Sequence, residues 1–151
     1  MKKLIILDLD NTLIFGTVNK KLKAEVLFHF SKILVIYKRP YAKEFVTRCQ
    51  EIGDVVVFTT AVKEYAAQVC EHLGINPIEL FTREDCQIIE DRYYKSVPDY
   101  YFDVYDDITI FEDYPGIWDS KSHEKCRIIK VKEFVGEVSD VELKKIITEN
   151  L

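Results

Sequence analysis

The chain has 151 residues, a hydrophobic fraction of 48% and a formal net charge of −5. This length predicts one domain with its own core, and the composition is that of a globular protein. The negative charge argues against tight, sequence-independent binding to nucleic acid, and no apolar run reaches membrane-spanning length. No secretory leader is predicted, and four scattered cysteines without a C-x-x-C pair are typical of reduced thiols in an intracellular protein of the cytoplasm or nucleus.

The first predicted element is a strand from Leu4 to Leu7, an uninterrupted apolar run typical of a strand buried on both faces of a parallel sheet. It runs directly into Asp8 and Asp10, and ligands collect at the carboxyl ends of strands in open α/β sheets. Burying two acids this close together is costly unless a cation sits between them. We therefore expect a functional pair here rather than a solvated turn.

The next part of the chain predicts a β-hairpin and a helix. Residues 14–23 are mixed and turn-prone, whereas residues 26–30 and 33–37 are rich in β-branched and aromatic residues and predict two paired strands. Helical periodicity extends from Ala42 to Ile52, and Gly53 is the expected terminator.

A second buried strand is predicted from Asp54 to Phe58, and it leads directly to Thr59. Residues 62–73 carry an apolar stripe at helical spacing that ends at Gly74. A third, short strand is expected near residues 79–81.

The remaining chain begins with a tyrosine-rich, acidic segment over residues 88–107. Residues 108–111 and 127–131 predict two more strands, and a last helix is expected to begin at Ser139, with a capping box between Ser139 and Glu142. The alternation of strands and helices predicts a three-layer αβα, Rossmann-like α/β fold around a parallel sheet of about five strands.

Polar side chains follow three of the predicted strands at the point where each strand ends. The carboxyl ends of parallel strands meet at one edge of the sheet, so these side chains converge there. Clustered carboxylates suit Mg²⁺, and a threonine hydroxyl and a lysine ammonium would neutralise and position a phosphoryl group beside them. The residues that follow the strands are Asp8, Asp10, Thr59, Glu112 and Asp113, and the lysine is Lys95 of the tyrosine-rich segment.

The string from Asp8 to Leu13, Asp-Leu-Asp-Asn-Thr-Leu, resembles the first motif of the haloacid-dehalogenase-like (HAD-like) phosphatases. More narrowly, the chain is similar to the small phosphatases of the RNA polymerase II carboxyl-terminal domain, the NLI-interacting-factor type. That similarity extends over nearly the whole chain. It rests on residues 37–40, 58–59, 65–66, 81–84, 94–95, 110–115 and 139–143.

The resemblance implies a role for each matching residue. Asp8 would be the nucleophile that forms an aspartyl-phosphate and also binds Mg²⁺. Asp10 would act as acid and base, with its backbone carbonyl on the metal. Thr59 and Lys95 would hold the phosphoryl group, and Asp113 would be the remaining protein ligand of Mg²⁺.

Two further positions are interpreted against the same family. Its fourth motif usually begins with Asp, and Glu112 stands there instead, so we expect Glu112 to orient Lys95 or a metal-bound water rather than to bind the metal itself. Arg83 lies twelve residues before Lys95, at the spacing of a substrate-binding arginine, and the alternative is a solvated loop arginine.

Substrate size is expected to follow from the segment between the first strand and the first helix. Residues 14–38 are enough for a hairpin flap but too few for a cap domain with its own core, so the chain is treated as a single domain over residues 1–151. One of Phe15, Phe28 and Phe30 is a candidate apolar wall of the site. An uncovered site favours phosphoserine, phosphothreonine or phosphotyrosine in a protein substrate.

Two alternatives to a phosphoprotein phosphatase remain open from the sequence. One is a phosphatase for a small phosphomonoester or for a nucleic-acid 3′-phosphate, although the net charge disfavours nucleic acid. The other is a phosphopeptide-binding module whose turnover is impaired at Glu112. No heptad pattern or interface stripe is present, which favours a monomer and leaves the oligomeric state open.

Overall fold

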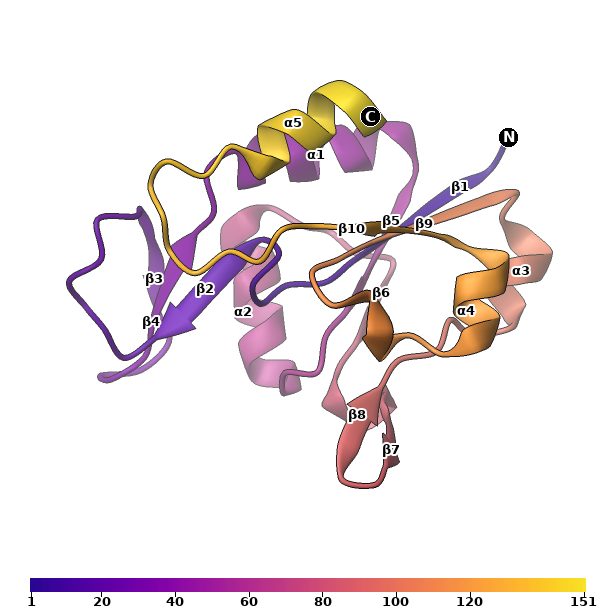
Figure 1. The fold of residues 1–151 in the computed structure, drawn as a ribbon, viewed down its shortest axis with the longest axis horizontal. Coiled ribbons are helices and arrows are strands. Elements are labelled where there is room, and N and C mark those ends of the chain that lie inside the picture. Colours follow the sequence, from indigo (N-terminus) through magenta and orange to yellow (C-terminus); the bar gives the residue numbers. More distant parts are fainter.

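The computed structural model describes residues 1–151 and is built around a parallel five-stranded sheet (Figure 1). The strand order is β10-β9-β1-β5-β6, so the first strand of the chain is central and pairs with β5 and β9. This confirms the predicted α/β fold. The strands are β1 (Lys3–Leu7), β5 (Asp54–Phe58), β6 (Glu79–Phe81), β9 (Asp107–Glu112) and β10 (Arg127–Lys130).

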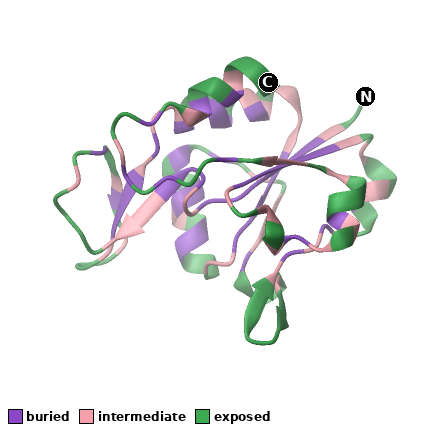
Figure 2. Ribbon diagram, in the orientation of Figure 1, coloured by how far each residue is buried: buried purple, intermediate pink, exposed green.

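Helices cover both faces of this sheet because alternate residues of its strands point to opposite sides. Ile5 and Leu7 pack on the face covered by α1 (Ala42–Ile52), α2 (Lys63–Leu73) and α5 (Glu142–Asn150). Leu4 and Ile6 pack on the other face, against α3 (Tyr100–Val104) and against Trp118. Trp118 lies just before α4 (Ser120–Lys125) in the chain. The central strands β1, β5 and β9 are therefore buried except at their first residues, which are half-buried (Figure 2).

A second, antiparallel sheet lies between β1 and α1 in the chain and has three strands rather than the two expected. Its order is β2-β4-β3, with β2 (Ile14–Thr17), β3 (Val26–His29) and β4 (Val35–Lys38). The hairpin of β3 and β4 is as predicted, but the turn-prone interpretation of residues 14–17 was wrong. Strand β2 is short and contains Gly16, and its strand conformation depends on pairing with β4.

The capping box predicted for the last helix is also wrong. The helix α5 begins at Glu142 with Val141 at its N-cap, and the side chain of Asp140, not that of Ser139, accepts a hydrogen bond from the backbone N of Glu142 at 3.3 Å. The Glu142 carboxylate instead accepts a hydrogen bond from the backbone N of Lys132 at 2.7 Å, and Asp140 is held by Arg39. Two tertiary contacts thus outcompeted a local capping pattern.

The two predicted helix terminators act in different ways. Gly74 adopts φ 74°, the left-handed conformation that ends α2. Gly53 after α1 is extended, and a Cβ there would lie 2.7 Å from the backbone O of Lys3, so this glycine permits a close approach of two strands.

Several short elements of the second half were not predicted individually. They are the helices α3 and α4, a small hairpin of β7 (Gln87–Ile89) and β8 (Arg92–Tyr94), and two single helical turns, η1 (Arg83–Asp85) and η2 (Pro115–Ile117). The four cysteines are unpaired, and none of the helices combines the length and apolar character needed to span a bilayer.

Candidate active site

The Lys95 ammonium lies at the centre of the cluster that follows the strands. Its Nζ is 2.8 Å from Oε1 of Glu112, 3.2 Å from Oδ1 of Asp8 and 2.8 Å from the carbonyl O of Phe58. The Lys95 side chain is buried, and its removal from water is offset by these acceptors and by the rings of Phe58 and Trp118, whose centroids lie 5.8 and 5.5 Å from Nζ. The two carboxylates raise the pKa of Lys95 against the opposing effect of burial, which keeps it cationic.

Thr12 joins the end of β1 to the end of β9. Its Oγ1 lies 3.0 Å from Oδ2 of Asp8 and 3.2 Å from Oδ1 of Asp113, and it accepts a hydrogen bond from the backbone N of Asp113 at 3.1 Å. A hydroxyl has one proton, so Thr12 donates to one carboxylate at a time. The contact fixes the spacing of Asp8 and Asp113.

Three carboxyl groups form a cluster with the geometry of a cation site. Carboxylate oxygens of Asp8, Glu112 and Asp113 lie within 4.8 Å of one another. Burial and the neighbouring Asp8 raise the pKa of Asp113 to about 7 and that of Glu112 to about 9. Burial acts against the charge of Asp8 too, but Lys95 and hydrogen bonds hold the pKa of Asp8 below its usual value. If all three were ionised, they would carry more negative charge than Lys95 neutralises, and the raised pKa values of Glu112 and Asp113 reflect that excess.

Asp10 stands apart from this cluster. Its Oδ1 accepts a hydrogen bond from the hydroxyl of Tyr65 at 2.7 Å. Burial and the charge of Asp8 raise the pKa of Asp10 to about 6, while the Tyr65 hydrogen bond and Lys95 oppose that rise. Asp8 and Asp10, two residues apart in sequence, therefore titrate in different pH ranges: Asp10 gives up its proton near pH 6, whereas Asp8 is ionised well below that pH.

Thr59 is buried directly after β5, beside the peptide whose carbonyl accepts from Lys95. Its backbone N donates to the O of Phe81, and its Oγ1 accepts from the backbone N of Ala61 at 3.1 Å. This turn fixes the threonine at the same edge of the sheet as Asp8, because Leu7 and Val57 are paired across β1 and β5.

Arg83 lies outside the buried cluster, on the exposed turn η1. Its Nε donates to the carbonyl O of Thr60 at 2.9 Å, and its guanidinium lies over the Tyr93 ring at 5.5 Å. Arg83 and Asp10 share one cavity of about 350 Å³, and Phe30 from the small sheet forms part of its apolar wall. Phe28 instead stacks on His72, and Phe15 packs with the cluster around Phe134.

A buried ion pair holds the turn that carries Asp10. Arg39 is fully buried, and its Nε and Nη2 contact Asp140 at 2.8 and 2.9 Å, while its Nη1 donates to the carbonyl O of Thr12 at 3.0 Å. Asn11 and Phe134 also exchange hydrogen bonds, through the backbone N of Phe134 and the side-chain amide of Asn11, and the Phe134 ring lies 5.3 Å from the Arg39 guanidinium. The turn is therefore held by two neighbouring sets of contacts.

The structure places Asp8, Lys95, Glu112 and Asp113 in direct contact, whereas Arg83 is at the rim. The sequence did not predict the contacts that four other side chains make with these residues or with the turn that carries Asp10: Thr12, Tyr65, Trp118 and Arg39. Thr12 was visible in the first motif, but Tyr65 appeared only as one position of an apolar helical stripe. Trp118, whose Nε1 donates to Oε1 of Glu112 at 3.1 Å, gave no sequence signal.

The fold resembles two solved structures. A structure of Fcp1, an RNA polymerase II CTD phosphatase, matches with a TM-score of 0.62 and 17% identity over 97% of this chain and 47% of that one. Fission yeast Fcp1 bound to beryllium fluoride matches with a TM-score of 0.63 and 18% identity, over 95% and 45%. At this identity the likeness concerns the fold.

Two curated proteins of Saccharomyces cerevisiae are similar in sequence. Nuclear envelope morphology protein 1 is 32% identical over 106 residues, which is 63% of this chain and 22% of that protein. Phosphatase PSR1 is 33% identical over 105 residues, 64% of this chain and 24% of that protein. The chain thus spans about a quarter of the length of these relatives.

The model of the NLI interacting factor-like phosphatases matches residues 3–150, which include all of the residues brought together above. The match confirms the resemblance drawn from the motifs. On this evidence, the chain belongs to the NLI interacting factor-like phosphatase family.

Proposed function

We propose that this chain is a Mg²⁺-dependent phosphatase that acts on phosphoserine or phosphothreonine in proteins through an aspartyl-phosphate. We further propose that residues 1–151 form a single phosphatase domain with a flap at residues 14–38. The observation that carries the proposal is the contrast between two neighbouring acids. Asp8 is held ionised against Lys95, whereas burial raises the pKa of Asp10 to about 6 beside Tyr65.

The two acids have complementary tasks in this scheme. A carboxylate oxygen of Asp8 attacks phosphorus, and the bond from phosphorus to the ester oxygen breaks as Asp10 gives that oxygen its proton. Water then attacks phosphorus, Asp10 takes the proton from the water, and the Asp8 carboxylate is released with inorganic phosphate. The atoms and protons balance, and Asp10 returns to its protonated form.

The residues at the cluster fit a hard cation such as Mg²⁺. Their donors are all oxygen atoms, and when all three are ionised their negative charge exceeds the single positive charge of Lys95. Asp8, Asp113 and the backbone carbonyl of Asp10 would hold the ion. When bound, it would neutralise charge on a phosphate oxygen so that an anionic nucleophile can approach.

Lys95 and Thr59 would bind the transferred phosphoryl group through the ammonium and the threonine hydroxyl with nearby backbone N–H groups. Glu112 occupies one side of the Lys95 ammonium at 2.8 Å. In this proposal Glu112 orients Lys95, as expected from its longer side chain, and Arg83 contacts the substrate beyond the phosphate.

A protein substrate is favoured because no folded cap covers the site. The small sheet over residues 14–38 supplies Phe30 and Leu34 to the cavity at Asp10, and that cavity is open to solvent. A short phosphorylated segment of a protein can enter such a site, and small metabolites gain little from it because few groups enclose them.

Hydrolysis of an aryl phosphate with Mg²⁺ tests the proposal. Wild type should turn over, Asp8→Asn should lose at least about a thousandfold in kcat, and chelation of Mg²⁺ should have a similar effect. Equal inertness of wild type and Asp8→Asn would leave a phosphopeptide-binding module. If turnover occurs but sugar or nucleotide phosphates are preferred over phosphopeptides, the proposal of a protein substrate fails.

A further inference from the structure

The hairpin of β7 and β8 stands away from the main sheet, as the lowest part of the molecule in Figure 1. Its two-residue turn, Glu90 and Asp91, has φ of 51° and 63°, the conformation of a tight β-turn with left-handed residues. Ile88 pairs directly with Tyr93 across the two strands, so both side chains lie on the same face of the hairpin. Ile88 is 65% exposed, so its aliphatic side chain is available for contact with another chain.

That face borders a cavity of about 350 Å³, which we call the hairpin groove. The groove shares two residues, Val62 and Arg83, with the separate cavity that contains Asp10. A substrate segment whose phosphorylated residue lies at Asp8 and Asp10 would therefore pass Arg83 to reach the groove. The wall of the groove includes Val62, Lys63, Arg83, Cys86, Ile88 and Tyr93.

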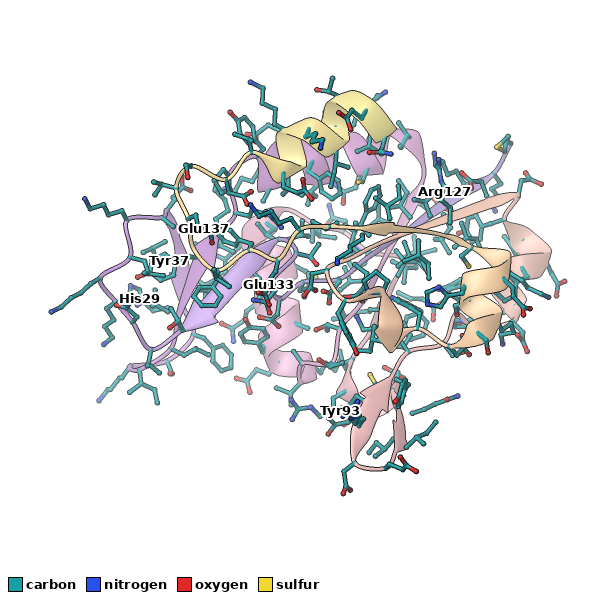
Figure 3. All side chains as sticks on the ribbon, viewed as in Figure 1. His29, Tyr37, Tyr93, Arg127, Glu133 and Glu137 are labelled. Atoms are coloured by element: carbon teal, nitrogen blue, oxygen red, sulfur yellow. The ribbon has the colours of Figure 1, made fainter.

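Arg83 is fixed at the junction of the two cavities. Its Nε is used by the carbonyl O of Thr60, and the Tyr93 ring supports the guanidinium at 5.5 Å. The two terminal nitrogens make no hydrogen bond to the protein, so they can bind a backbone carbonyl or a carboxylate of a passing chain. Tyr93, labelled in Figure 3, thus forms part of the groove and also supports Arg83.

We propose that the hairpin groove binds an apolar side chain of the phosphoprotein substrate, a few residues from the phosphorylated one. This inference rests on the proposed function and specifies its substrate: a segment with a phosphorylated residue and a nearby large aliphatic or aromatic residue. The groove is then a specificity site separate from the phosphate site and from the cavity lined by Phe30.

The size and charge of the groove fit such a segment better than a second copy of the chain. A volume of about 350 Å³ is at the small end of ligand cavities and suits one side chain, whereas a stable dimer needs on the order of 800 Å² from each partner. Arg83 and Lys63 outnumber Glu84 among the charged residues of the groove, which suits an anionic phosphorylated segment.

The test uses labelled phosphoserine peptides and the Asp8→Asn variant, which separates binding from turnover. Leu replaces Ala in turn at each position within about three residues of the phosphoserine, a reach of roughly 10 Å in an extended chain. Fluorescence anisotropy should show one position at which Leu binds about tenfold more tightly than Ala. The same preference should appear in kcat/KM of the wild-type background.

The hairpin itself supplies a matched control. Ile89 is 53% exposed and is adjacent to Ile88, but it faces the opposite side of the strand. Ile88→Glu should remove the preference for Leu, whereas Ile89→Glu, the same change one residue further, should keep it. Light scattering on both variants records the oligomeric state.

Absence of a position-dependent preference, or a preference that survives Ile88→Glu, would overturn the inference. So would a dimer that Ile88→Glu dissociates while peptide preference is unchanged, because the groove would then bind a second copy. Aryl phosphate hydrolysis reports separately on the proposed function. If the protein prefers Leu-containing peptides but does not hydrolyse aryl phosphate, the groove is supported in a protein that binds phosphopeptides without turnover. If it hydrolyses aryl phosphate but shows no such preference, the proposed groove is rejected and the proposed function stands.

Discussion

The hydroxyl of Tyr65 lies 2.7 Å from Oδ1 of Asp10, which makes a helix residue the direct partner of the proposed acid. Tyr65 is on α2, and Asp10 follows β1, so the contact joins two elements that are far apart in the chain. The hydrogen bond stabilises the ionised form of Asp10 and opposes the effect of burial on its pKa.

Tyr65→Phe removes that hydrogen bond, so the pKa of Asp10 should rise above about 6. Asp10 must be protonated to donate in the first step, so kcat/KM falls as pH rises through its pKa. The high-pH limb of the profile of kcat/KM against pH should therefore move to higher pH in Tyr65→Phe. Tyr100→Phe, which removes an exposed phenol bonded to Glu79, should leave the limb in place.

The variants Asp113→Asn and Glu112→Gln should distinguish the roles of the two acids at the end of β9 in Mg²⁺ binding. Asp113 is proposed as a metal ligand, so Asp113→Asn should weaken Mg²⁺ binding about a hundredfold or more, measured by isothermal titration calorimetry. Glu112 contacts Lys95 and Trp118, so Glu112→Gln should cost only about tenfold in affinity. An equal loss in both variants would instead make Glu112 a direct ligand.

The metal-free protein should lose stability as pH rises from about 5 to about 9. The pKa values of Asp10, Asp113 and Glu112 are raised to about 6, 7 and 9 from 3.8, 3.8 and 4.5, so the native state binds more protons than the unfolded state over this range. The lowered pKa of Asp8 acts in the opposite direction, but only near and below its ordinary value of 3.8.

Urea unfolding in the presence of a chelator measures this pH dependence, and we expect the free energy of unfolding to fall by at least about 2 kcal/mol between about pH 5 and about pH 9. Saturating Mg²⁺ should make the free energy of unfolding less dependent on pH, because the cation stabilises the ionised carboxylates. A metal-free protein that grows more stable toward pH 9 would contradict the protonation states assigned to the cluster.

Breaking the pair of Arg39 and Asp140 should destabilise the protein by about 3–5 kcal/mol, because one buried charge is left without its partner. Arg39→Lys should rescue little, since an ammonium cannot contact both carboxylate oxygens and the carbonyl of Thr12 at once. The matched surface pair of Arg48 and Glu51 should cost less than about 1 kcal/mol when broken. Thermal and urea unfolding compare the two pairs.

The sequence was sufficient for the main sheet because the central strands are apolar runs and the helices carry clear stripes. Strand β2 and the capping of α5 were mispredicted because tertiary pairing decided both. The proximity of Asp8 and Asp113 could be predicted because the carboxyl ends of parallel strands meet at one edge of the sheet. The contacts of Tyr65 and Arg39 could not, since only the fold shows that one helical position faces Asp10 and that a buried arginine meets Asp140.

The central position of β1 has a consequence for how the protein acquires its site. The first strand to be synthesised pairs with β5, about fifty residues later, and with β9, about a hundred residues later. Such separations make folding slow relative to local structure, because long loops must close before the contacts form. A nascent chain that ends before β9 carries Asp8 without the edge that supplies Glu112 and Asp113. The acidic cluster is therefore assembled only after β9 has been made, about a hundred residues after β1.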